Sequence, residues 1–174
     1  MESRDSNRRL AGANVARLAT VNDEGQPHVV PIVFALEGDT LYFVVDWKPK
    51  KTTNLKRLKN IAANPAVSVL VDHYEDDWTL LWWVRADGTA RVITDDAESR
   101  HAIDLLANKY PQYWHHPPAG RVVAIRIDRL TGWSGAGTFT SRSAPAAPAQ
   151  PDRPETPRSG PPRREGRDRR NDHR

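Results

Sequence analysis

The sequence contains no cysteine among its 174 residues. Disulfides, thiolate nucleophiles, and zinc or iron–sulfur sites with cysteine ligands are therefore excluded. The chain also has no apolar run long enough for a signal peptide or a membrane-spanning helix. These absences favour a soluble cytoplasmic protein, and we expect no membrane partner.

The last part of the chain, from Ser141 onward, lacks aromatic residues and is rich in proline and arginine. It holds seven of the 14 prolines, and nine arginines against five acidic residues. Because such a composition buries too little apolar surface to fold, we predict a folded domain over 1–140 and a disordered tail over 141–174. The tail accounts for the net charge of +4, since the remaining residues hold 17 basic and 17 acidic side chains. Without aromatic residues for base stacking, it argues against a specific nucleic-acid role.

Short apolar segments separated by turn residues dominate the folded part. We predict strands at 17–21, 27–36, 41–45, 67–71, 78–85 and 89–94, a two-residue hairpin turn at 87–88, and a last strand from 123 that ends near 133. Helices are predicted over 7–14, from the threonines at 52–53 to 65, and from 95 to 108, with an irregular loop at 113–118. About seven antiparallel strands favour a closed or nearly closed barrel, because closure removes exposed edges. Pro31 lacks a ladder donor, which places its strand at an edge or bulge.

A basic stretch without any acidic residue stands at the start of the second predicted helix. It contains Lys48, Lys50, Lys51, Lys56, Arg57 and Lys59. The start of a helix carries partial positive charge and normally attracts acidic side chains, so this concentration of cations implies a bound anion. Free backbone N–H groups and threonine hydroxyls there are typical of a phosphate site. A solvated basic face is the alternative interpretation.

No other pattern marks a catalytic or metal site. His115 and His116 offer two adjacent ligands, fewer than a metal site needs. The acidic segment 73–77 lacks the spacing of a calcium loop, and the glycines at 135 and 137 are too few for a dinucleotide fingerprint. We therefore predict no metal and no catalytic side chain, and expect a bound cofactor to supply any chemistry.

Six tryptophans are a high content for the folded part. Trp82 and Trp83 are adjacent on a predicted strand, so their side chains point to opposite faces. At most one of them can lie inside the barrel. The other needs a ligand, a helix or a partner subunit to cover it.

In order and spacing, these segments resemble the pyridoxamine 5′-phosphate oxidase-like split-barrel proteins. The resemblance rests on the first hairpin (19–31), on Lys50-Lys51-Thr52-Thr53-Asn54-Leu55, on Asn64-Pro65 before an apolar strand, and on 83–90. The resemblance covers residues 8–135. More narrowly, the chain looks like the actinobacterial flavin/deazaflavin oxidoreductases that use coenzyme F420. The resemblance implies a mainly β (α+β) fold: a six- to seven-stranded antiparallel split barrel of the FMN-binding type, with short flanking helices.

The resemblance also implies a site. In that family two barrels form a homodimer and the cofactor lies in the groove between them. By this resemblance, the phosphate of the cofactor would be held by Lys51 and Thr52, with Lys48, Lys50 and Asn54. The ring of the cofactor would lie along Pro31, Ile32 and Val33. The groove would be lined by Trp82, Trp83 and Trp133, partly from the other subunit. The basic helix is longer than in typical members, so Lys56 or Arg57 is an alternative phosphate ligand.

Charge favours one of two cofactors. FMN carries one phosphate, whereas F420 adds an oligoglutamate tail with several carboxylates. The six clustered positive charges suit the more anionic ligand, and the excess of arginine over lysine is consistent with a GC-rich genome of the kind that encodes deazaflavin users. The sequence thus predicts an F420-dependent oxidoreductase that transfers a hydride to or from a small organic molecule. An FMN-dependent oxidase or reductase, and a non-catalytic flavin- or haem-binding protein, are the alternatives.

Overall fold

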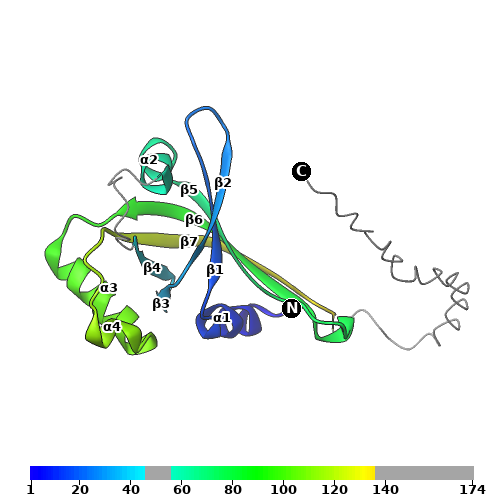
Figure 1. Ribbon diagram of the computed structural model, residues 1–174. Helices are drawn as coiled ribbons and strands as arrows, with labels where there is room; N and C mark the ends of the chain where they lie inside the picture. Colours follow the sequence, from blue (N-terminus) through cyan, green and yellow to red (C-terminus); the bar gives the residue numbers. More distant parts are fainter. Residues whose placement is uncertain (46–55, 136–174) are drawn as a thin grey trace, which may run out of the picture. The chain divides into compact units, whose positions relative to one another are not determined.

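Figure 1 shows the computed structural model, which describes residues 1–45 and 56–135. Its helices are α1 (Ser3–Gly12), α2 (Lys56–Ala63), α3 (Asp96–Lys109) and α4 (Gln112–His115), with a 3-10 turn, η1 (Trp78–Leu80). Its strands are β1 (Ala16–Val21), β2 (Pro27–Ile32), β3 (Ala35–Glu37), β4 (Thr40–Val44), β5 (Ala66–His73), β6 (Trp82–Val92) and β7 (Val122–Ser134). The predicted disordered tail and the predicted helix start at 52–53 lie outside the described residues.

The seven described strands form one antiparallel sheet in the order β2-β1-β5-β6-β7-β4-β3. Its two edges, β2 and β3, follow each other in sequence, with Val33 and Phe34 between them. Three peptide units span at most roughly 11 Å, so the sheet must curl until its edges come close. The predicted nearly closed barrel is thus confirmed as a seven-stranded curled sheet, and Pro31 lies on an edge strand as predicted.

The single strand predicted over 27–36 is wrong. The backbone leaves the sheet at Val33 and re-enters it at the opposite edge as β3. At the crossing, Phe34 is fully buried, and its N–H and C=O are both bonded to the Tyr110 hydroxyl, at 3.1 and 2.8 Å. Because a buried backbone needs hydrogen-bond partners, this tyrosine is what allows the chain to change edges.

The hairpin turn predicted at Asp87-Gly88 is also wrong, because β6 runs unbroken from Trp82 to Val92. Its register with β7 shifts between Asp87 and Gly88, which marks a β-bulge. A type I′ turn needs positive φ at both central residues, and neither residue has it. Gly88 is required for close packing instead, since a Cβ there would lie 2.2 Å from the Arg126 carbonyl oxygen.

Smaller differences concern the ends of elements. The N-terminal helix begins at Ser3 rather than at residue 7, and the loop predicted at 113–118 begins inside α4. Residues predicted to open the fifth strand instead form η1, because the Asp77 carboxylate caps this turn by accepting from the Thr79 N–H at 2.9 Å. β6 therefore begins at Trp82.

Two groups of buried apolar side chains stabilise the sheet. Inside the curl, inward-facing residues of successive strands, including Leu18, Val69 and Val84, are fully buried. Outside it, Ala102 and Leu106 of α3 pack against β4 and β7, so the buried side chains of this helix lie on one face. Figure 1 shows α3 and α4 beside β3 and β4, and α1 and α2 at opposite ends of β1. None of the helices in the described ranges is both long and apolar enough to cross a membrane.

Candidate functional site

The basic segment predicted to bind phosphate is described only from α2 onward. Lys48, Lys50, Lys51, Thr52 and Asn54 lie outside the described residues, and their roles stay predictions. The chain enters this segment after Val45, whose N–H donates to the Arg121 carbonyl at 2.9 Å. It leaves it where α2 begins, at Lys56.

A buried polar contact fixes α2 to the end of the curled sheet. The Asn60 Nδ2 donates to the Thr20 Oγ1 of β1 at 2.9 Å, and these residues are 2% and 1% exposed. Ile61 packs into the interior cluster beside them. The first turn of α2 contains no acidic residue, and Lys56 and Lys59 are exposed. The helix therefore presents ammonium groups on a firmly held backbone.

One buried polar atom beside this contact has no hydrogen-bond partner among the described residues. The Nδ1 of His28 is buried and makes no hydrogen bond within the described ranges. His28 lies opposite Thr20 in the β1–β2 ladder, and its carbonyl accepts from the Thr20 hydroxyl at 3.4 Å. Because an unsatisfied buried nitrogen costs free energy, this corner of the fold has hydrogen-bonding capacity for a further group.

The three residues predicted to lie along the cofactor ring face different ways. Pro31 is exposed and lies opposite Arg17 of β1. Ile32, 6% exposed, joins the interior cluster, and Val33 packs against the cluster under α3. Of the three side chains, that of Pro31 is therefore open to a ligand, together with the backbone of an edge strand.

The three predicted tryptophans divide between the two faces of the sheet. Trp82 packs against the interior cluster, and its ring contacts the Arg9 guanidinium at 4.7 Å and the stacked His73 ring at 6.1 Å. Trp83 and Trp133 lie directly opposite each other on β6 and β7, so they share the other face. The expectation that Trp82 and Trp83 point to opposite faces is confirmed.

Trp83 and Trp133 belong to a surface that we call the outer face, formed by the outward residues of five adjacent strands. It comprises Arg17, Ala19, Val29, Pro31, Ser68, Leu70, Asp72, Trp83, Arg85, Asp87, Arg129, Thr131 and Trp133. None of these side chains is buried. No element in the described part of the chain therefore covers this face.

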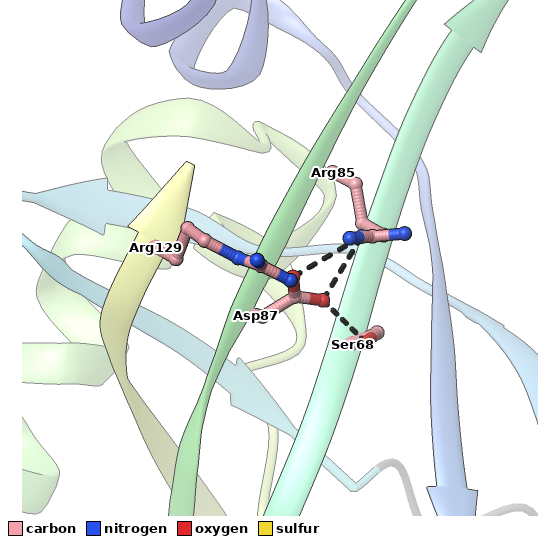
Figure 2. Close-up of polar contacts among 4 residues, drawn as sticks. All are labelled: Ser68, Arg85, Asp87 and Arg129. Carbon is pink, nitrogen blue, oxygen red and sulfur yellow. Dashed lines mark hydrogen bonds and ion pairs between the residues drawn. The ribbon is translucent and has the colours of Figure 1, made fainter. Parts of the chain in front are cut away.

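Charged side chains at the centre of the outer face form a network around Asp87 (Figure 2). Its carboxylate accepts from the Ser68 Oγ at 2.6 Å, the Arg129 Nη2 at 2.9 Å and the Arg85 Nε at 3.2 Å. Partial burial acts to raise the pKa of Asp87, but the hydrogen bonds from Ser68, Arg129 and Arg85 outweigh it and hold the pKa below its usual range. Asp87 is thus a carboxylate that orients two guanidinium groups.

Sequence reasoning missed this network because it assigned Asp87 to a turn. The available signal is the alternation of Trp83, Arg85 and Asp87, which places these three side chains on one face if the strand continues. Ser68 and Arg129 carry no such signal, since their approach to Asp87 depends on the pairing of β5 and β7 with β6.

Metal ligands do not gather in the described ranges. Among residues 1–45 and 56–135, no three His, Asp or Glu side chains are placed to hold an ion. In the acidic loop, the His73 Nε2 instead bonds to the Glu75 carboxylate at 2.9 Å.

Comparison with known proteins agrees with this architecture. The family model described as pyridoxamine 5′-phosphate oxidase matches residues 5–134. A solved structure of a FAD-binding protein from Mesorhizobium loti is 26% identical, with a TM-score of 0.59, and the match covers 76% of this chain and 94% of that one. No curated protein matches the sequence.

Two further solved structures share the fold at lower identity. The conserved hypothetical protein Rv2991 from Mycobacterium tuberculosis is 17% identical, with a TM-score of 0.67 over 86% of this chain and 95% of that one. The haem storage protein HutZ from Vibrio cholerae is 14% identical, with a TM-score of 0.60 over 76% and 93%. These two show the fold alone. Because the family model matches most of its sequence, the chain belongs to the pyridoxamine 5′-phosphate oxidase family.

Proposed function

We propose that this protein is an F420-dependent oxidoreductase that transfers a hydride between the deazaflavin and a small organic acceptor. The observation that carries the proposal is the basic helix α2, which begins without an acidic residue and is fixed to β1 through Asn60 and Thr20. Membership of the family and the likeness to a FAD-binding protein support a flavin-like ring. The concentration of positive charge supports the more anionic deazaflavin over FMN.

The described residues fit an anionic, conjugated cofactor. Lys56 and Lys59 are exposed on α2. The Nδ1 of His28 makes no hydrogen bond within the described ranges, and the His28 carbonyl accepts from Thr20, the residue that holds α2. In the proposed site, Lys51 and Thr52 hold the phosphate together with Lys48, Lys50 and Asn54. The ring then follows the edge strand β2 at Pro31, where side chain and backbone are open.

The role of the protein in catalysis is to position the reactants. The bound deazaflavin supplies the hydride chemistry. The edge strand β2 orients the ring, the basic segment before α2 holds the phosphate, and Trp83 and Trp133 exclude water from the groove. Orientation of two reactants can supply much of a rate enhancement without a catalytic side chain, so we assign none.

We propose that the groove is completed by a second copy of the chain, in a homodimer built on the outer face. This face combines exposed apolar side chains, including Val29 (60% exposed) and Trp133 (37% exposed), with arginine and tryptophan, which are enriched at protein interfaces. It also carries charges of both signs, as a self-complementary two-fold contact requires.

Turnover tests the proposal. The full-length protein is mixed with reduced deazaflavin and a panel of small conjugated acceptors, and oxidation of the deazaflavin is followed by its absorbance. We expect oxidation that depends on both the protein and an acceptor. Tight binding without oxidation by any acceptor would contradict the proposed activity.

A non-catalytic flavin- or haem-binding protein is the second candidate, and an FMN-dependent oxidase or reductase is the third. The second is favoured by the shared fold of a haem storage protein. It predicts a haem spectrum on titration and no electron transfer from deazaflavin. The third predicts FMN binding tighter than that of deazaflavin.

A further inference from the structure

The crossing from β2 to β3 lies directly beside the proposed ring site. The ring is proposed to follow the edge of β2 at Pro31, and Phe34 is the residue at which the chain passes to the opposite edge of the sheet. A proline in an edge strand has its nitrogen on the side away from the sheet. Because backbone groups alternate in direction along an antiparallel strand, the Val33 N–H points the same way. The donor that this edge offers to a ring is therefore next to the crossing.

One hydroxyl, that of Tyr110 at the end of α3, holds the crossing in place. It accepts from the Phe34 N–H at 3.1 Å. Its single proton is shared between two acceptors, the Phe34 carbonyl at 2.8 Å and the Asn14 carbonyl at 2.9 Å. Burial raises the pKa of Tyr110, so the hydroxyl keeps this proton at neutral pH. Both backbone groups of Phe34 are thus fixed by a side chain of α3.

The same hydroxyl connects the two strands at this end of the sheet. Asn14 precedes β1, which begins at Ala16, and Ala16 lies opposite Ile32, the last residue of β2. Tyr110 therefore joins the chain that enters β1 to the chain that leaves β2, just beyond their last ladder pair. Because the ends of paired elements open most easily, this connection keeps the end of β2 from fraying.

We infer that Tyr110 is a positioning residue for the cofactor ring, which it orients by fixing the backbone at the end of β2. The inference rests on the proposed function and adds to it a residue of α3, far in sequence from both β2 and the basic segment. Tyr110 acts through Phe34 and does not touch the ring. Its effect can still be large, because a displacement of roughly 1 Å between reacting groups can lower a rate about 100-fold.

Tyr110→Phe tests the inference in the full-length protein, because it removes the hydroxyl and keeps the ring. Without cofactor, the amides of Ile32 and Phe34 should exchange their hydrogens faster than in the unmodified protein. With saturating deazaflavin, the absorbance of the bound ring should shift toward that of the free cofactor. The rate of hydride transfer under the same conditions should fall roughly tenfold or more.

Lys109→Met is the matched control, because Lys109 is the neighbour of Tyr110 and also holds backbone carbonyls. Its Nζ donates to Ala11 and Ala13 at the end of α1, at 3.0 and 2.7 Å. It also lies 4.3 Å from the centre of the Phe34 ring, a space that methionine still fills. Lys109→Met should lower stability but leave the spectrum of the bound ring unchanged. An equal spectral shift in both variants would reflect a general loss of stability and would overturn the positioning role.

The outcomes also distinguish this inference from the proposed function. If the unmodified protein does not bind deazaflavin, the proposed function fails. If it binds, and Tyr110→Phe keeps the spectrum of the bound ring and the rate of hydride transfer, the cofactor proposal stands and the role of Tyr110 is overturned. Should Tyr110→Phe fail to fold, the unmodified protein decides: slow exchange of the Phe34 amide supports the inference, and rapid exchange overturns it.

Discussion

The Asn60 amide of α2 and the Thr20 hydroxyl of β1 form a hydrogen bond of 2.9 Å in an almost fully buried position. The contact joins two residues that are 40 positions apart in the sequence and connects the basic helix to the curled sheet. In the proposed function, this contact keeps α2 in a fixed position relative to β1 and to its neighbouring strand β2.

Replacement of Thr20 by valine keeps the shape of the side chain and removes the acceptor for Asn60. Because the buried amide is left unsatisfied, we expect the free energy of unfolding to fall by roughly 1–3 kcal/mol and cofactor affinity to fall with it. Urea denaturation measures the first effect and titration the second. Thr131→Val on the outer face, where the residue is half-buried, is the control and should change stability little. Equal stability of the Thr20→Val variant and the unmodified protein would contradict the role of the contact.

Gly88 is expected to be sensitive to substitution although it has no unusual backbone angle. A Cβ at this position would lie 2.2 Å from the Arg126 carbonyl oxygen, so Gly88→Ala must displace β6 from β7 at the bulge. We expect a loss of roughly 1–3 kcal/mol in the free energy of unfolding. Gly12→Ala, with no atom within 4 Å of the new Cβ, should instead be neutral or slightly stabilising. Thermal melts that rank the two variants in the opposite order would contradict the packing argument.

The hydrogen-bonded pair of His101 on α3 and Glu37 on β3 predicts that its contribution to stability depends on pH. The hydrogen bond from His101 to Glu37 (2.7 Å), with the charge of that carboxylate, raises the pKa of His101 above its usual 6.5. Any stabilisation by the pair is therefore present below pH 6.5 and is lost as the pH rises through the raised pKa. An NMR titration of the His101 ring should show the raised pKa, and Glu37→Gln should lower it. An identical titration curve in that variant would show that Glu37 is not the cause.

The outer face predicts the oligomeric state. Trp83→Glu places a charge at the centre of the proposed two-fold contact and should convert a dimer into a monomer, as measured by light scattering. Trp114→Glu is the control, because Trp114 is 65% exposed on α4, away from the outer face. A monomeric unmodified protein would contradict the proposed homodimer, and a Trp83→Glu variant that remains dimeric would show that the interface lies elsewhere.

Local patterns in the sequence are enough to predict most of the elements. Short apolar segments between turn residues predicted β1, β4, β5 and β7, and helix-start and helix-stop signals predicted a helix from 95 to 108, where α3 lies. The count of seven strands is correct because two errors cancel: one predicted strand is divided into β2 and β3, and two are joined as β6. Both errors arise from long-range contacts, the Tyr110 hydroxyl at Phe34 and the Arg126 backbone at Gly88.

The candidate site was predictable in part. The sequence predicts that the side chains of Trp82 and Trp83 point to opposite faces of the sheet. The structure adds that Trp133 lies opposite Trp83. The sequence gives no sign that Arg17 and Arg85 both lie opposite Leu70, because that relationship depends on the register of three strands. The roles predicted for Lys48 to Asn54 stay predictions, since these residues lie outside the described ranges.

The most direct measurement is an equilibrium titration of the full-length protein with deazaflavin, FMN and haem under the same conditions, repeated with Lys51→Ala. The account predicts that deazaflavin binds most tightly, and that Lys51→Ala weakens its binding at least several-fold while the melting temperature of the cofactor-free protein stays nearly unchanged. Tighter binding of FMN or haem, or unchanged deazaflavin affinity in Lys51→Ala, would contradict it.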